Sequence, residues 1–176
     1  MAIEKLVFTN AGKQPLKIEM EYMYREVRTA PERSSGGIHS FIVYTVNDGL
    51  KKVEPGDSAM FAITYQAVNK TSDIIKANVD SEENARKNRV TQIQSLLQLE
   101  TPDTLLNTMF AFAKIRATER LYNTKAGFMH GPGGLRYYAA IWANDQAEQI
   151  KPFSACLGDH VAIKSEQNSY RLVARE

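Results

Sequence analysis

The feature of this 176-residue sequence that most constrains its fold is a change in the spacing of its apolar residues near residue 75. Up to about residue 70, apolar and polar residues alternate, as in β-strands that bury one face. From Val79 onward, apolar residues recur every three or four positions, as in helices that bury one side. The sequence therefore predicts an α+β chain with two regions, a β region over residues 1–75 and a helical region over residues 76–176.

Alternation is clearest in two runs of the first region. One covers residues 15–26, and the other covers residues 58–68 after the turn-forming residues 54–57. Shorter strand candidates are residues 3–8 and 38–46. Because alternation indicates strands with one buried face, these runs predict an antiparallel β-sheet that forms one layer or a portion of a β-sandwich.

Three helical segments are predicted in the second region. The first starts near Val79, where acidic residues occupy the first turn. The second has Thr101 as its N-cap and Pro102 at its first helical position, and it runs to about Tyr122. The last covers residues 165–176 and reaches the C-terminus without a capping glycine. The chain is therefore expected to stop inside a helix.

Composition excludes several classes of function. The net charge is +2, from 22 basic and 20 acidic residues, which argues against a dedicated nucleic-acid or membrane-surface binder. No apolar stretch approaches the roughly 20 residues of a membrane-spanning helix, and the charged Glu4 and Lys5 argue against a signal peptide. His39, His130 and His160 are far apart in sequence. We therefore predict neither a metal site nor a cofactor.

The segment with the composition of a ligand-binding loop covers residues 124–153. It combines glycines at 131, 133 and 134 with several aromatic residues, and glycines allow a backbone to approach a ligand closely. Arg136 and Tyr138 lie beside these glycines and are candidate ligand contacts. This segment is therefore the predicted functional loop.

Trp142, Asn144 and Asp145 together have the chemistry of a sugar site. An indole stacks on the apolar face of a pyranose, while amide and carboxylate groups hydrogen-bond its hydroxyls. The alternative interpretation is a core tryptophan followed by a helix N-cap at Asn144 or Asp145. The residues alone leave both interpretations open.

Three stretches resemble the start of the catalytic domain in six-hairpin glycosidases, a superfamily that includes α-L-rhamnosidases and glucoamylases. These are LETPDTLLNTMFAFAKIRATERLY, GFMHGPGGLRYYAAIWANDQAE and PFSACLGD. Many members carry a tryptophan, two further residues and then a sugar-binding aspartate, which here correspond to Trp142 and Asp145. Asn144 stands where arginine is common. The resemblance implies that residues 76–176 are the first helices of an incomplete (α/α)6 toroid, with a β-sandwich portion before it.

The function that the resemblance implies is that of a glycoside hydrolase fragment acting on oligo- or polysaccharides. The fragment would supply part of the sugar-binding subsite, with Trp142, Asn144, Asp145, Arg136 and Tyr138 as substrate contacts. Since the catalytic carboxylates of the superfamily come from later hairpins, this chain alone is expected to be inactive. The compartment stays open at this point, with a periplasmic or secreted parent enzyme as one alternative. A noncatalytic carbohydrate-binding or interaction module is the alternative, and exposed apolar helix faces would favour self-association.

Overall fold

The computed structural model describes residues 1–30, 32, 37–70, 73–131 and 141–175. These residues form antiparallel sheets and α-helices, which confirms the predicted α+β class. They divide into two compact units, Met1–Asn84 and Ala85–Glu176. The boundary therefore lies within the first helix, α1 (Val79–Ser95), rather than ahead of it.

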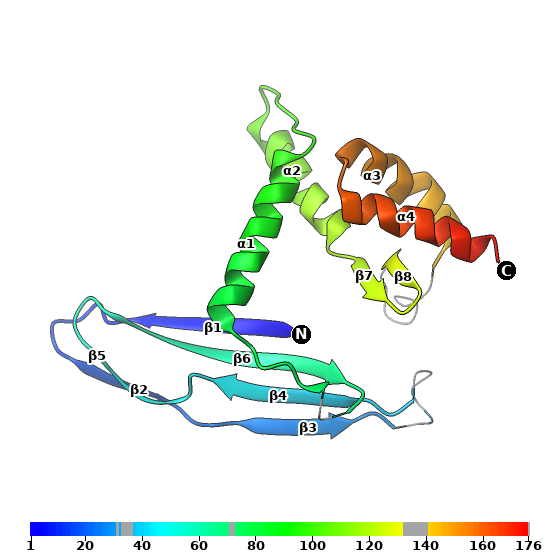
Figure 1. Cartoon of the computed structure of the whole chain (residues 1–176). Coiled ribbons are helices and arrows are strands. Elements are labelled where there is room, and N and C mark those ends of the chain that lie inside the picture. Colours follow the sequence, from blue (N-terminus) through cyan, green and yellow to red (C-terminus); the bar gives the residue numbers. More distant parts are fainter. Residues whose placement is uncertain (31, 33–36, 71–72, 132–140, 176) are drawn as a thin grey trace. The chain divides into compact units, whose positions relative to one another are not determined.

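The first unit contains a four-stranded antiparallel sheet in the order β1-β6-β4-β3 (Figure 1). A separate two-stranded antiparallel sheet pairs β2 with β5. The longest strand, β6, pairs with β1 along one edge and with β4 along the other. The strands are β1 (Ala2–Thr9), β2 (Leu16–Met20), β3 (Tyr24–Arg28), β4 (Ser40–Val46), β5 (Gly49–Val53) and β6 (Ser58–Val68).

The continuous strand predicted over residues 15–26 is two strands in the structure, and β5 was not predicted. Strand β2 pairs with β5, whereas β3 pairs with β4. The turn from β4 to β5 uses left-handed backbone at Asn47 and Gly49, with φ of 60° and 97°. Alternation indicates that a segment is extended, but it does not indicate where the pairing partner changes.

One face of the larger sheet is covered by the segment that leads into α1. The Gln66 side chain donates to the Ile75 carbonyl oxygen at 2.6 Å and accepts from the Ile75 backbone N–H at 2.9 Å. Tyr44 donates its hydroxyl hydrogen to the same carbonyl. Gln66 thus pairs with both backbone polar groups of Ile75, which holds the segment on the sheet.

The other face of this sheet is only partly covered. Phe61 is fully buried there, where Val53 and Ala59 surround it and the Lys51 ammonium lies 4.7 Å from its ring centroid. Phe41, on the same face, is exposed. The sandwich portion that the sequence predicts therefore stays a prediction.

The second unit combines helices with a short β-hairpin. After α1 come α2 (Thr104–Thr118), β7 (Leu121–Thr124) and β8 (Gly127–His130). A π-helix, η3 (Asp145–Ile150), runs into α3 (Lys151–Leu157), and α4 (His160–Val173) follows. Helix α4 packs against β8 and α3 (Figure 1). The toroid arrangement also stays a prediction.

The predicted start and end of the second helix were wrong. Asp103 is the N-cap of α2, and its carboxylate accepts from the backbone N–H groups of Leu105 and Leu106 at 2.9 and 3.1 Å. The Thr101 hydroxyl instead contacts Asn107 at 2.9 Å. Helix α2 ends at Thr118 because the following residues form β7, which pairs with β8.

The predicted C-terminal helix was also wrong in its bounds. Helix α4 begins at His160, capped by Asp159, and ends at Val173, before the last described residue. Helix α3 was missed, although it has local signals at both ends. Pro152 lies in its first turn, and Gly158 ends it in the left-handed region with φ of 72°.

Helix α2 exposes the more apolar of its two sides. Leu105, Met109 and Phe112 lie on one side, and Phe112 is 64% exposed. Lys114, on the opposite side, is 2% exposed. Its ammonium donates to three carbonyl oxygens at the end of α1, those of Gln94, Leu96 and Leu97, at 3.0, 2.6 and 3.1 Å. A polar group thus fixes α2 to α1, and an apolar stripe faces outward.

We predict that two copies of the chain associate through this stripe, with the two α2 helices antiparallel. Antiparallel pairing would bring the acidic N-terminal end of α2, with Glu100 and Asp103, near Arg116 of the second copy. The sedimentation coefficient should therefore rise with protein concentration. The double variant Met109→Ser/Phe112→Ser should abolish that rise, because it removes apolar area from the interface.

The matched control for this prediction is Tyr22→Ser, since Tyr22 is an exposed aromatic residue of the first unit. It should leave the concentration dependence unchanged. If the sedimentation coefficient of the wild-type chain does not change with protein concentration, the prediction is wrong. That result is expected if the stripe packs against another part of the same chain.

Candidate functional site

The candidate site is positioned by the hairpin of β7 and β8 on α4. The Asn168 amide of α4 donates to the carbonyl oxygens of Ala126 and Phe128, at 2.7 and 3.1 Å. Gly127 has φ of 98°, and a Cβ there would lie 3.0 Å from the Asn168 side chain. Glycine therefore allows both the turn and its close contact with α4.

At the end of the hairpin, His130 is buried against Gln146 of the π-helix. The Gln146 amide donates to the His130 carbonyl oxygen at 3.2 Å and lies 3.4 Å from Nδ1 of the ring. Oε1 of Gln146 is buried and accepts no hydrogen bond from the described residues.

Burial and charge both act on His130. Desolvation lowers its pKa, and the Arg120 guanidinium lowers the pKa further. The Asp145 carboxylate acts in the opposite direction. Burial and Arg120 thus favour the neutral imidazole, whose surroundings include a cation from the end of α2 and an anion from the π-helix.

The π-helix has a local cause in the sequence. Pro152 has no N–H group, and its ring would clash with the carbonyl of Glu148 in a regular α-helix. The wider turn relieves this conflict, and the Lys151 N–H bonds the carbonyl of Gln146 instead. Such turns occur frequently at functional sites. Asp145 and Gln146 are the first two residues of this turn.

Trp142 and Asp145 lie close together at the start of the same helical segment. The Trp142 carbonyl oxygen accepts from the Gln146 N–H at 3.1 Å, so Asp145 is less than one helical turn from Trp142. Trp142 is 44% exposed, Asp145 is half-buried and Asn144 is exposed. An aromatic surface and a carboxylate are thus both accessible within one turn.

The exposure of Trp142 does not fit the alternative of a core tryptophan, whereas Asn144 does occupy the N-cap position of the π-helix. The indole is not in the core, and Asn144 has helical backbone angles without a side-chain capping bond. Asp145 lies inside the helical segment rather than at its cap. Arg136 and Tyr138, the other two predicted contacts, lie outside the described residues.

Two features of the site were not predicted from the sequence. His130 and Gln146 lie in the predicted functional loop, but neither was proposed as a ligand contact, and their own contact joins residues 16 positions apart. The hairpin had one usable signal, the turn at Lys125 and Ala126 followed by Gly127. The partner of His130 had no comparable local signal.

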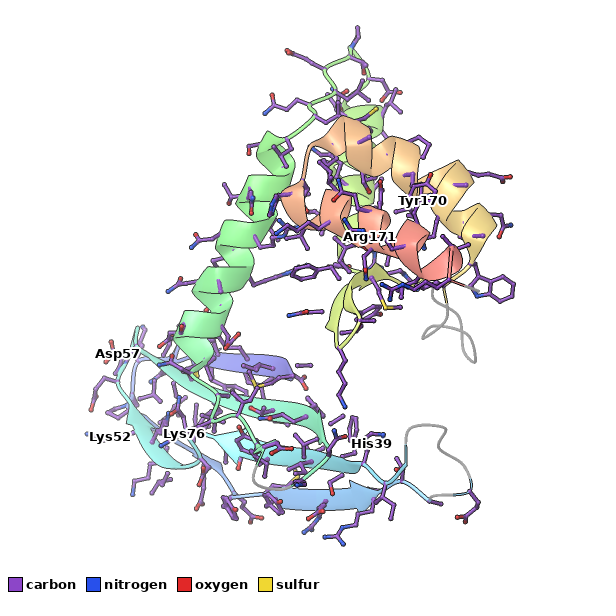
Figure 2. The ribbon with its side chains drawn as sticks, turned by 45° about the vertical axis from the view of Figure 1, so that its right-hand side comes forward. His39, Lys52, Asp57, Lys76, Tyr170 and Arg171 are labelled. Carbon is purple, nitrogen blue, oxygen red and sulfur yellow. The ribbon has the colours of Figure 1, made fainter. Side chains whose placement is uncertain are left out.

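A second polar cluster joins α3 to α4. Glu166 of α4 is buried, and burial raises its pKa although Ser154 of α3 hydrogen-bonds the carboxyl group. The Lys151 ammonium lies over the ring of Tyr170, which Figure 2 labels on α4. Burial lowers the pKa of Lys151. Because its partners belong to the two helices themselves, we assign this cluster to their packing.

Among the residues that the structure describes, no three metal-ligating side chains converge. No helix in that part of the chain is long and apolar enough to cross a membrane. Comparison of the whole chain with known proteins gave no matching family model, no matching curated protein and no matching solved structure.

Proposed function

We propose that this chain is a carbohydrate-binding part of a glycoside hydrolase and that Trp142 and Asp145 contact the sugar. The observation that carries the proposal is the exposed indole within one helical turn of an accessible carboxylate. An indole face covers the apolar face of a pyranose, and a carboxylate accepts hydrogen bonds from its hydroxyls.

The surroundings of this pair support the same function. Asn144 is exposed beside Asp145 and adds an amide that can donate and accept. The contact between Gln146 and His130 fixes the first turn of the π-helix to the hairpin, which holds the site in one geometry. Arg136 and Tyr138 remain proposed contacts on the resemblance to six-hairpin glycosidases. We assign Asp145 to holding the sugar and not to proton transfer.

The test uses the fact that Trp142 is the single tryptophan of the chain, so its fluorescence reports on the site directly. We expect titration with L-rhamnose, D-glucose, D-galactose or their oligosaccharides to change the emission. Trp142→Ala should weaken binding about tenfold or more, measured by calorimetry, because a stacking surface is lost. Asp145→Asn should weaken binding by a similar factor, because the amide keeps the shape but loses charge-assisted hydrogen bonds.

Matched controls separate binding from folding. Tyr22→Ala removes an exposed aromatic ring from the first unit, and Glu148→Gln neutralises an exposed carboxylate of the same π-helix. Both should bind like the wild type. If Asp145→Asn lowers the thermal midpoint and leaves affinity unchanged, Asp145 has only a structural role. If no sugar changes the fluorescence or the calorimetric signal, the proposed function is wrong.

A further inference from the structure

Strand β3 is an edge strand whose outer side pairs with no strand in the described part of the chain (Figure 1). At one end of its inner side, the Thr45 N–H of β4 donates to the Met23 carbonyl oxygen at 3.0 Å. At the other end, the Thr29 N–H donates to the His39 carbonyl oxygen at 2.9 Å. Neighbouring residues of an antiparallel strand direct their backbone polar groups to opposite sides. The odd-numbered residues of this segment therefore face β4, and three even-numbered residues face outward: Tyr24, Glu26 and Arg28.

A pocket with apolar walls lies beside the start of this edge. Arg25 of β3, Thr45 of β4 and Ile63 of β6 line it on one face of the sheet. Residues 20–23, which include two methionines, complete the lining. The volume is about 360 Å³, within the range of small-molecule sites, so the pocket has room for an apolar side chain.

Apolar surface continues along the same face, past Arg25. Val27 lies two residues after Arg25, so both side chains project from one face of β3. Val27 is directly opposite Phe41 of β4, and the two residues are 67% and 49% exposed. The edge thus presents a pocket, a guanidinium and a second apolar surface in that order.

The guanidinium between the two apolar places has no acidic partner among the described residues. Arg25 donates only to the carbonyl oxygen of its neighbour Tyr24, at 3.4 Å. Glu21 also lines the pocket, but it forms no ion pair with Arg25 in that part of the chain. Arg28, in contrast, is paired with Glu26 on the other face. A partner strand with an acidic residue directly opposite Arg25 would therefore be favoured.

We infer that the outer edge of β3 binds an extended peptide segment of another protein, which adds a strand to the sheet. In an antiparallel addition, an acidic residue of the peptide lies opposite Arg25. An apolar residue two positions earlier lies opposite Val27, and one two positions later lies opposite Met23, beside the pocket. Backbone hydrogen bonds supply affinity, and the pocket and Arg25 supply specificity. This binding is separate from the proposed sugar site and does not depend on it.

The probe is the fluorescein-labelled peptide Thr-Val-Thr-Glu-Thr-Leu-Thr with both ends blocked. We expect its fluorescence anisotropy to rise to saturation as the concentration of the full chain increases. Replacing its glutamate by lysine should weaken binding about fivefold. Arg25→Glu should reverse this preference. The matched control is Arg171→Glu, which makes the same charge change at an exposed residue of α4 (Figure 2) and should keep the preference.

A second experiment tests the backbone pairing itself. Glu26→Pro removes an outward-facing N–H and leaves the hydrogen bonds to β4 in place, so it should abolish binding. Glu26→Ala is its matched control, because it loses the same side chain but keeps the N–H. N-methylation of the third and fifth peptide residues should also abolish binding, since their N–H groups face β3. N-methylation of the fourth and sixth residues should not.

The results that would overturn the inference are distinct. No binding of the peptide, or equal binding of the glutamate and lysine peptides, would show that the inference is wrong. The other edge strand is β1, where the N–H of Val7 faces outward because that of Asn10 bonds Asp57 of the neighbouring chain segment. Loss of binding in Val7→Pro but not in Glu26→Pro would place the peptide on β1 instead.

Two further measurements separate this inference from the other proposals. Concentration-dependent sedimentation that is lost in Glu26→Pro but kept in Met109→Ser/Phe112→Ser would show that a second copy occupies the edge, which would overturn the inference. Trp142→Ala should bind the peptide like the wild type, so failure of sugar binding leaves the peptide result standing. Far-UV circular dichroism confirms that each variant is folded.

Discussion

Replacement of Asp159 by asparagine is expected to lower the free energy of unfolding of the second unit by about 2 to 4 kcal/mol. Asp159 is 1% exposed, and both of its carboxylate oxygens pair with Arg89 of α1, at 2.6 and 2.8 Å. Asparagine keeps the cap on the Ala162 N–H but leaves the guanidinium without its anion. Because Arg89 is 30% exposed and can be hydrated, the expected loss is smaller than for a fully buried pair.

The same ion pair gives the stability a defined pH dependence. Hydrogen bonds from Arg89 hold the pKa of Asp159 below its ordinary value of 3.8, despite its burial. The stabilisation is therefore fully present above that ordinary value and is lost as the pH falls through the lowered pKa of the folded state. Asp159→Asn should lack this acid-dependent loss. Urea unfolding across an acid pH series, followed by circular dichroism, measures both effects.

Asp103→Asn is the matched control, since Asp103 is the exposed N-cap of α2. Asparagine caps helices about as well as aspartate does, so this variant should lose only a few tenths of a kcal/mol. Equal losses for Asp159→Asn and Asp103→Asn would show that the ion pair adds nothing to the cap. A double-mutant cycle with Arg89→Gln measures the pair directly. If the two residues stabilise each other, the double variant should lose less free energy of unfolding than the sum of the two single variants.

Replacement of Lys114 by methionine is expected to lower the free energy of unfolding by about 2 kcal/mol. Methionine fills a similar volume, so the main loss is the three hydrogen bonds to carbonyls in and just after the last turn of α1. The end of that helix depends on this lysine, since Leu97 is left-handed there, with φ of 39°, without being glycine. Burial lowers the pKa of Lys114, and this desolvation cost limits the net effect.

Lys164→Met is the control for this second prediction, because Lys164 is an exposed lysine of α4. It should change the free energy of unfolding by no more than about 0.5 kcal/mol. Urea unfolding measures the global loss, and amide hydrogen exchange should accelerate in the last turn of α1 in Lys114→Met alone. A Lys114→Met chain that is as stable as the wild type would show that desolvation of the ammonium cancels its three hydrogen bonds.

The order of strands before helices could be predicted from the sequence, because the spacing of apolar residues reports on local backbone geometry. The start of α1 near Val79 was also predictable, since the acidic first turn and the helical spacing occur together there. Trp142 and Asp145 were selected by their chemistry and their short separation, and one helical turn was enough to bring them together. These features depend on residues that are neighbours in the chain.

Contacts between distant segments were decided by the tertiary structure alone. Lys114 is buried only because three carbonyls at the end of α1 accept hydrogen bonds from its ammonium group. Gln146 contacts His130 because the hairpin of β7 and β8 folds back onto the π-helix. A polar group can be buried only where protein groups replace its hydrogen bonds to water. Those protein groups belong to distant segments of the chain. The spacing of apolar residues within one segment does not predict where the other segments lie.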